Sequence, residues 1–185
     1  MAVSFSGAAG AAGGVQQAYE LKHDPLLEGQ LSDIRDNTIG TYVNETSDVI
    51  AFGNVVAYAS GGTVDNSAKT VSGTTAPVVG VNVLTYVDET AKDANDRPGV
   101  KVSQAMNVAN QGAVAVFVHG SVTPASPVRV IHTTTGVKYA GQFSNVVISG
   151  NTGLLSNARY LTSVAGSGLA IVELNGPSFT LTANA

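Results

Sequence analysis

The chain has 185 residues, of which 44% are hydrophobic and 12% are charged, with a net charge of −4 and no cysteine. This length fits one domain, or one domain with an arm, and the hydrophobic content is sufficient for a core. The absence of cysteine excludes disulfides and thiolate metal sites. The basic residues are scattered, which argues against a nucleic-acid partner, and no apolar run reaches the ~18–20 residues of a membrane helix.

The charged fraction is about half that of an average soluble domain. A surface with few charges is buried against a partner at little desolvation cost, because few ions must leave water. The composition therefore favours extensive protein–protein contact.

The first 41 residues show no strand pattern. Residues 1–14 are rich in Gly and Ala, and the polar stretch that follows contains spaced apolar residues. Leu27, Leu31 and Ile34 have the i, i+4, i+7 spacing of a short helix, but Pro25 and Gly29 argue against a long one. We predict an N-terminal arm over residues 1–41, extended or with short helical turns; a helix that packs on the protein's own core is the alternative.

From Tyr42 onward, short runs rich in Val, Ile, Thr and aromatic residues alternate with Gly, Asn, Ser, Asp and Pro. This pattern is typical of many short strands without crossover helices. It predicts a mainly β domain over residues 42–185, folded as a β-barrel or β-sandwich. The expected strands are Val49–Ala59, Val78–Thr85, Val100–Val108, Ala113–His119, Val128–Thr133, Asn145–Ser149, Ala158–Val164, Gly168–Leu174 and Ser178–Thr182.

Two of these runs, 113–118 and 168–174, are apolar on both faces, with Glu173 as the exception. Such strands lie in the middle of a packed structure or at a subunit interface. The low charge content favours the interface for at least one of them.

The sequence contains no pattern of residues that indicates catalysis, so we expect no enzyme, no catalytic residues and no cofactor. His23, His119 and His132 are far apart in the sequence, and we expect no metal site. The acidic loop 93–99 (DANDRPG) lacks the ligand spacing of an EF-hand, and the turn preferences of Asp, Asn and Pro are enough to explain it. A calcium-binding loop and a metal-binding jelly roll remain as alternatives.

One stretch is more specific than composition. Residues 26–57 read LLEGQLSDIRDNTIGTYVNETSDVIAFGNVVA, with a Gly-Gln-Leu-x-Asp segment, then Val-Asn-Glu, then an Ile-Ala-Phe-Gly-x-Val-Val strand. Val-Val-Gly-Val at 78–81, and the strands 112–119 and 127–130, follow in order. Together these fragments resemble the structural cement (decoration) proteins of tailed bacteriophages. The Gly/Ala-rich start and the loop 93–99 have no counterpart in that resemblance.

The resemblance implies a β-domain with an N-terminal arm, which binds the outer surface of an expanded phage head and stabilises contacts between major capsid protein subunits. It implies synthesis in the host cytoplasm, location in the virion and assembly as a homotrimer; the sequence also allows a dimer or a monomer. A subunit of a tail, fibre or other surface appendage is the alternative. The arm residues expected to contact the capsid or another subunit are Tyr19, Leu21, Leu26, Leu27, Leu31 and Ile34; otherwise they cover the protein's own barrel.

Overall fold

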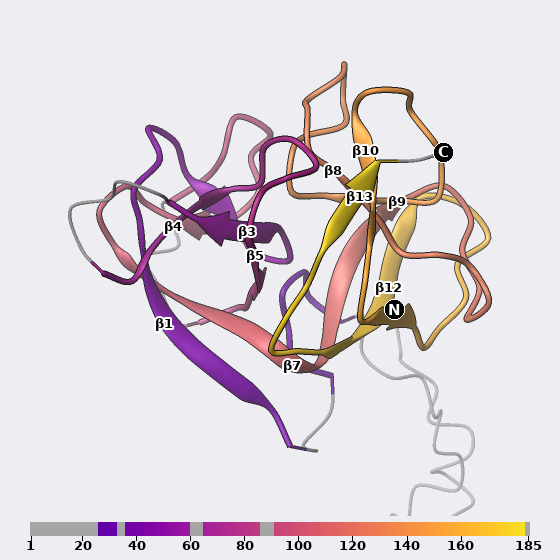
Figure 1. Ribbon diagram of the computed structural model, residues 1–185, viewed down its shortest axis with the longest axis horizontal. Coiled ribbons are helices and arrows are strands. Elements are labelled where there is room, and N and C mark those ends of the chain that lie inside the picture. The colour runs from indigo at the N-terminus through magenta and orange to yellow at the C-terminus, as the bar shows by residue number, and fades with distance from the viewer. Residues whose placement is uncertain (1–25, 33–35, 60–64, 86–90, 184–185) are drawn as a thin grey trace, which may run out of the picture.

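The computed structural model describes residues 26–32, 36–59, 65–85 and 91–183. The described residues form strands, turns and loops, and contain no helix (Figure 1). The prediction of a mainly β fold is confirmed. The strands are organised in two lobes, a small barrel and a second, open sheet, which share one long strand.

The first lobe is a closed five-stranded barrel. Its strands follow one another in the order β1-β4-β3-β5-β7, and β7 pairs again with β1 to close the ring. All pairs are antiparallel except β1 with β4. Because the ring is closed, each of these strands is paired on both edges over at least part of its length. The barrel strands are β1 (Thr38–Asn44), β3 (Val55–Tyr58), β4 (Ser67–Thr70), β5 (Val78–Asn82) and β7 (Ala105–His119).

The second lobe is built on the other half of β7. One edge of β7 pairs with β12, which in turn pairs with β11, and the other edge leads through β9, β8 and β10 to β13. A separate two-stranded sheet joins β2 (Ile50–Ala51) to β6 (Gly99–Val100). The second-lobe strands are β8 (Arg129–Ile131), β9 (Phe143–Ser144), β10 (Thr152–Leu155), β11 (Ala158–Tyr160), β12 (Gly168–Asn175) and β13 (Leu181–Ala183).

The 15-residue strand β7 connects the two lobes. Along one edge it pairs with β1 up to Gln111, and from Gln111 onward with β12. Gly112 lies at this change of partner with φ +123°, and a Cβ there would stand 1.9 Å from Oδ1 of Asn37. Only glycine fits this position, since both the backbone conformation and the close approach exclude a side chain.

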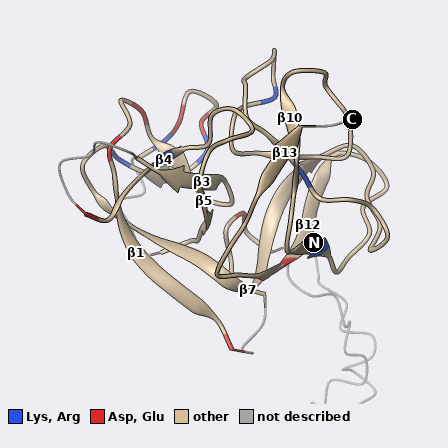
Figure 2. Ribbon diagram, viewed as in Figure 1, with Lys and Arg blue, Asp and Glu red and all other residues tan. Residues whose placement is uncertain are grey.

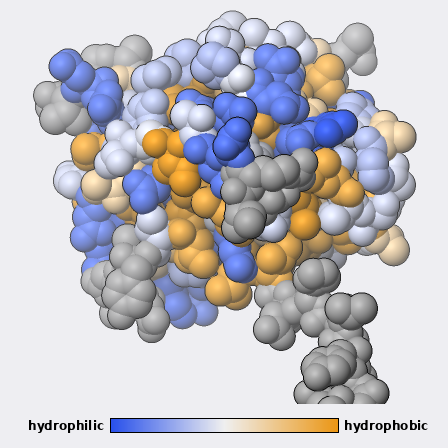
Figure 3. Space-filling model, turned by 90° about the horizontal axis from the view of Figure 1, so that it is seen from below, coloured by the Kyte–Doolittle hydropathy of each residue, from blue (hydrophilic) through white to orange (hydrophobic). Residues whose placement is uncertain are grey.

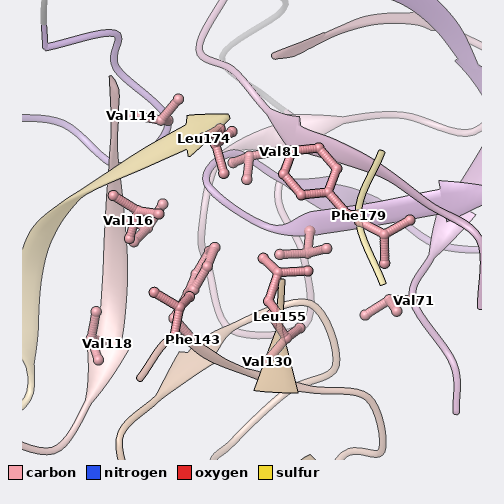
Figure 4. Close-up of a cluster of buried hydrophobic side chains, with 14 of the residues drawn as sticks. Val71, Val81, Val114, Val116, Val118, Val130, Phe143, Leu155, Leu174 and Phe179 are labelled. Carbon is pink, nitrogen blue, oxygen red and sulfur yellow. The ribbon is translucent and has the colours of Figure 1, made fainter. Parts of the chain in front are cut away.

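Two clusters of buried side chains fill the molecule. The smaller one includes Phe52, Val56 and Met106 and lies on the barrel strands and the short β2–β6 sheet. The larger one joins barrel residues such as Val55 and Val81 to second-lobe residues (Figure 4). The second-lobe members shown there are Val114, Val116, Val118, Val130, Phe143, Leu155, Leu174 and Phe179. Because side chains of both lobes meet in one core, the lobes form one structural unit.

The expected strands agree with the structure in part. Val49–Ala59 is two strands, β2 and β3, separated by a turn at Phe52-Gly53. The expectation of a strand over Asn145–Ser149 is wrong, because these residues form bends and turns after β9. Ser144 Oγ accepts the Val146 N–H and Thr152 Oγ1 accepts the Ile148 N–H, so side chains replace the strand partners.

The two runs with two apolar faces pair with each other, β7 with β12. Val116, Ala170 and Val172 point into the larger core. On the opposite face Phe117 lies across from Leu169, which is 38% exposed. One face of this ribbon therefore belongs to the core, and the other face is partly open.

Candidate functional site

The described base of the predicted arm is attached to the β-domain. The Gly29 N–H donates to the Ala115 carbonyl at 2.7 Å, the Ala115 N–H donates to the Gln30 carbonyl at 2.8 Å, and the Ser32 N–H donates to the Ala113 carbonyl at 2.9 Å. The Gly29 carbonyl also accepts the Leu84 N–H at 2.8 Å. Residues 29–32 therefore lie as a short antiparallel partner of β7, between the places where β5 and β9 pair with it (Figure 1).

The candidate contact residues take different positions. Leu31 forms a bridge with Val114 and packs against the larger core. Leu27 is 61% exposed, at a turn closed by the Gln30 N–H to Leu27 carbonyl bond, and Leu26 is half-buried. Tyr19, Leu21 and Ile34 lie outside the described residues. β1 begins at Thr38 and crosses the boundary that the sequence predicts after Thr41.

An ionic network fixes the arm base to the loop 93–99. Arg97 donates from Nη1 to Glu28 at 3.1 Å and to the Asn54 side-chain oxygen at 3.2 Å, and from Nη2 to Asp93 at 2.7 Å. The side chains of Arg97, Glu28 and Asp93 are only 17%, 19% and 11% exposed. The guanidinium thus joins three separate segments of the chain, at a site where charged hydrogen bonds are stronger than in water.

The same contacts account for the acidic loop. Asp93 Oδ1 accepts the backbone N–H groups of Asn95 and Arg97, at 2.8 and 3.0 Å, while Oδ2 accepts both Nε and Nη2 of Arg97. All the acceptor positions that a cation would need on Asp93 are engaged by donors of the protein. The loop is a turn organised by Asp93, and its geometry does not support the calcium alternative.

Sequence reasoning missed this network. Glu28 and Arg97 are 69 residues apart, and neither has a pattern that predicts the other as its partner. The only signal was indirect: Arg97 lies in a loop rich in turn residues, where a basic side chain can satisfy neighbouring acceptors.

Because Glu28 is buried in this network, its titration makes the free energy of unfolding depend on pH. Burial raises the pKa of Glu28, and the Arg97 guanidinium opposes this shift in part. The folded-state pKa then exceeds the unfolded-state pKa, so the stabilising contribution is complete below the unfolded-state value and is lost as pH rises through the folded-state value. We expect the Tm of Glu28→Gln, relative to the unsubstituted protein, to increase between about pH 4 and about pH 7. Thermal unfolding at both pH values checks this; a Tm difference that is constant or falls with pH contradicts it.

Within the described ranges, no three His, Asp or Glu residues lie close enough together to hold a metal ion. His119 instead contacts the Gln142 side chain, with 2.8 Å between Nε2 and Oε1. Because that oxygen also accepts the Tyr139 N–H, Nε2 of His119 is the donor. Burial lowers the pKa of His119, the bond to Gln142 opposes this, and Lys138 and Arg97 lower it further.

The part of the chain that the structure describes contains no helix long and apolar enough to span a membrane. Seen from below, hydrophobic residues cover much of the middle of the molecular face (Figure 3). The exposed, large apolar side chains in the first half of the described chain include Leu27, Ile39, Tyr58 and Leu84. Such exposed apolar area is typical of proteins that bind other macromolecules.

Comparison with known proteins identifies the class. The family described as structural cement protein (E217 gp24/Pam3 gp6) matches residues 15–175. The chain therefore belongs to this family of phage structural cement proteins, and its role is that of a capsid cement protein in the virion.

A solved structure titled "The capsid of Myoviridae Phage XM1" contains a chain of similar fold, with a TM-score of 0.62 and 15% sequence identity. The similarity covers 88% of this chain and 98% of the other. A search of curated proteins finds no match. At this identity the XM1 structure supports the fold, and the family match supports the role.

Proposed function

We propose that this cement protein binds the outer surface of an expanded phage head and stabilises the contacts between neighbouring major capsid protein subunits, without catalysing a reaction. The observation that carries the proposal is the family match over residues 15–175. The net charge of −4 supports an outer position, because packaged DNA repels an acidic protein.

We place the shell contact on the N-terminal arm. Its base is held by four backbone hydrogen bonds and the Arg97 network, and it presents Leu27 at 61% exposure. Burying apolar arm side chains against the shell contributes roughly 25 cal/mol per Å². Tyr19, Leu21, Leu26, Leu27 and Ile34 are the proposed contacts, while Leu31, packed on the core, holds the base in place.

Several copies acting together would strengthen such an arm contact. An oligomer, for which we propose a trimer, presents its arms at high effective concentration, and avidity then exceeds a single contact by ~10²–10⁴. Weak contacts at each arm are therefore sufficient for stable decoration.

The test is co-sedimentation of the purified protein with expanded, undecorated heads of a phage that encodes it, and with unexpanded heads. We expect saturable binding to expanded heads only, labelled on their outer face by antibody. A variant lacking residues 1–25, which retains every described residue, should bind at least about tenfold more weakly while its Tm changes little.

Three kinds of result would contradict all or part of the proposal. Equal binding to both kinds of head, or none to either, contradicts the shell role. Full binding by the shortened variant contradicts the arm as the contact, and leaves the shell role in place. A protein that polymerises alone and ignores heads would indicate an appendage subunit.

A further inference from the structure

Three loops at the far end of the second lobe, together with the strand residues that flank them, contain no charged residue. They are residues 120–128 (GSVTPASPV), 144–153 (SNVVISGNTG) and 160–171 (YLTSVAGSGLAI), and none includes Asp, Glu, Lys or Arg. Figure 2 shows the loops on the far right of the molecule in tan, without red or blue, whereas several loops of the barrel contain red and blue segments. We call these three segments the uncharged end.

Hydrogen bonds join the three loops at Gly120. The Gly120 N–H donates to Ser167 Oγ at 3.2 Å, and a Cβ on Gly120 would meet the Val146 side chain at 3.3 Å. The Asn145 side chain donates to the Ser121 carbonyl. Val122 and Val164 exchange two backbone bonds of 2.9 Å each. Because these bonds cross between loops, the uncharged end is an organised surface rather than a set of independent loops.

Apolar side chains are exposed on this surface. Val146 is 46% and Val147 is 50% exposed, on a loop whose backbone is held by Ser144 and Thr152. A pair of neighbouring exposed valines on a fixed backbone loses little conformational entropy on burial, since Val has few side-chain rotamers. The neighbouring Ser, Thr, Gly and Pro residues can be buried without removing an ion from water.

The distribution of charge along the chain indicates which partner fits. The described residues before Ala105 include seven acidic and four basic side chains, a net charge of −3, whereas residues 105–183 hold only Arg129, Lys138, Arg159 and Glu173, a net charge of +2. In a closed oligomer the same residues of every copy come together near the symmetry axis, where like charges repel one another. The acidic barrel side therefore opposes self-contact, and the uncharged end permits it.

We propose that copies of this chain contact one another through the uncharged end, with Val146 and Val147 of each copy packed near the symmetry axis. The proposal rests on the oligomer invoked in the proposed function and assigns its interface. It leaves free the arm base of each copy, residues 29–32, which pairs with the edge of β7 opposite to β12.

The test is the mass in solution of the full chain and three variants, measured by light scattering and sedimentation velocity. We expect the unsubstituted protein to associate, and the double variant Val146→Asp/Val147→Asp to associate at least about tenfold more weakly, since the new carboxylates face each other. Val137→Asp is the matched control: Val137 is 76% exposed on another loop, and this variant should associate normally. An equimolar mixture of the double Asp variant with Val146→Lys/Val147→Lys should recover association, which a folding defect would not allow.

The proposal is overturned if the unsubstituted protein is a monomer up to high concentration, if the double Asp variant associates as well as the control, or if the mixture does not associate. These measurements use no phage heads. If self-association fails these tests while co-sedimentation with heads is normal, the proposed interface is wrong and the shell role stands. If self-association behaves as expected while the protein does not bind heads, the interface stands and the shell role is wrong.

Discussion

Replacing Phe143 by alanine is expected to lower the free energy of unfolding by about 3–5 kcal/mol, the usual cost of emptying a large aromatic site in a core. Phe143 is fully buried, and Figure 4 shows it among core side chains of the neighbouring strands. β9, which carries it, is the strand that joins β7 to β8. Because barrel and second-lobe side chains share this core, we also expect both lobes to unfold in a single transition at a lower denaturant concentration.

Urea or guanidinium unfolding followed by two probes, circular dichroism and tyrosine fluorescence, measures this effect. Val137→Ala removes an aliphatic side chain that is 76% exposed, and should change the free energy of unfolding by less than about 0.5 kcal/mol. Separate transitions for the two probes in the Phe143 variant would contradict a common core.

Replacing Arg97 by methionine is expected to cost about 3–5 kcal/mol, because it leaves carboxylates in a largely buried site without their cation. Glu28, Asp93 and the side-chain oxygen of Asn54 each lose the charged guanidinium that donates to them. Methionine keeps much of the aliphatic stem, so the measured loss reports the polar contacts more than the packing. Since Arg97 connects the arm base to the barrel, the variant should also expose the amide hydrogens of residues 29–32 to exchange.

Arg159→Met is the matched control for this change. Arg159 pairs with Glu173, but its side chain is 64% exposed, and exposed ion pairs contribute about 0–1 kcal/mol. The two variants remove the same group, so equal losses from both would show that the Arg97 network has no special role. Thermal or chemical unfolding of both variants in one buffer decides between these outcomes.

The sequence predicted the mainly β class of the fold better than it predicted the ends of the strands and the pairing between them. Alternation and turn residues identified the positions of β5, β8 and β12, because hydrophobic periodicity is a local property. It did not reveal that β7 continues through Asn110-Gln111-Gly112, since polar residues and a glycine usually end a strand. β4, which reads Ser-Ala-Lys-Thr, was missed because its position is set by pairing with β1 and β3.

The candidate site shows the same limit. Local patterns select apolar residues such as Leu27 and Leu31, but whether each one faces solvent or the core depends on contacts with β7, far along the chain. The valines at 146 and 147 illustrate the opposite error. They have the composition of a strand, while the side chains of Ser144 and Thr152 hold them in an exposed loop.

The central claim, that this protein reinforces a phage head, is tested most directly by the stability of the head itself. Expanded, undecorated heads are heated with and without saturating protein, and their disruption is followed by release of DNA or by light scattering. We expect added protein to raise the disruption temperature, and to raise it more as more copies bind, because a ligand that binds only the intact shell stabilises it by mass action. Heads that bind the protein fully and yet break at an unchanged temperature would contradict it.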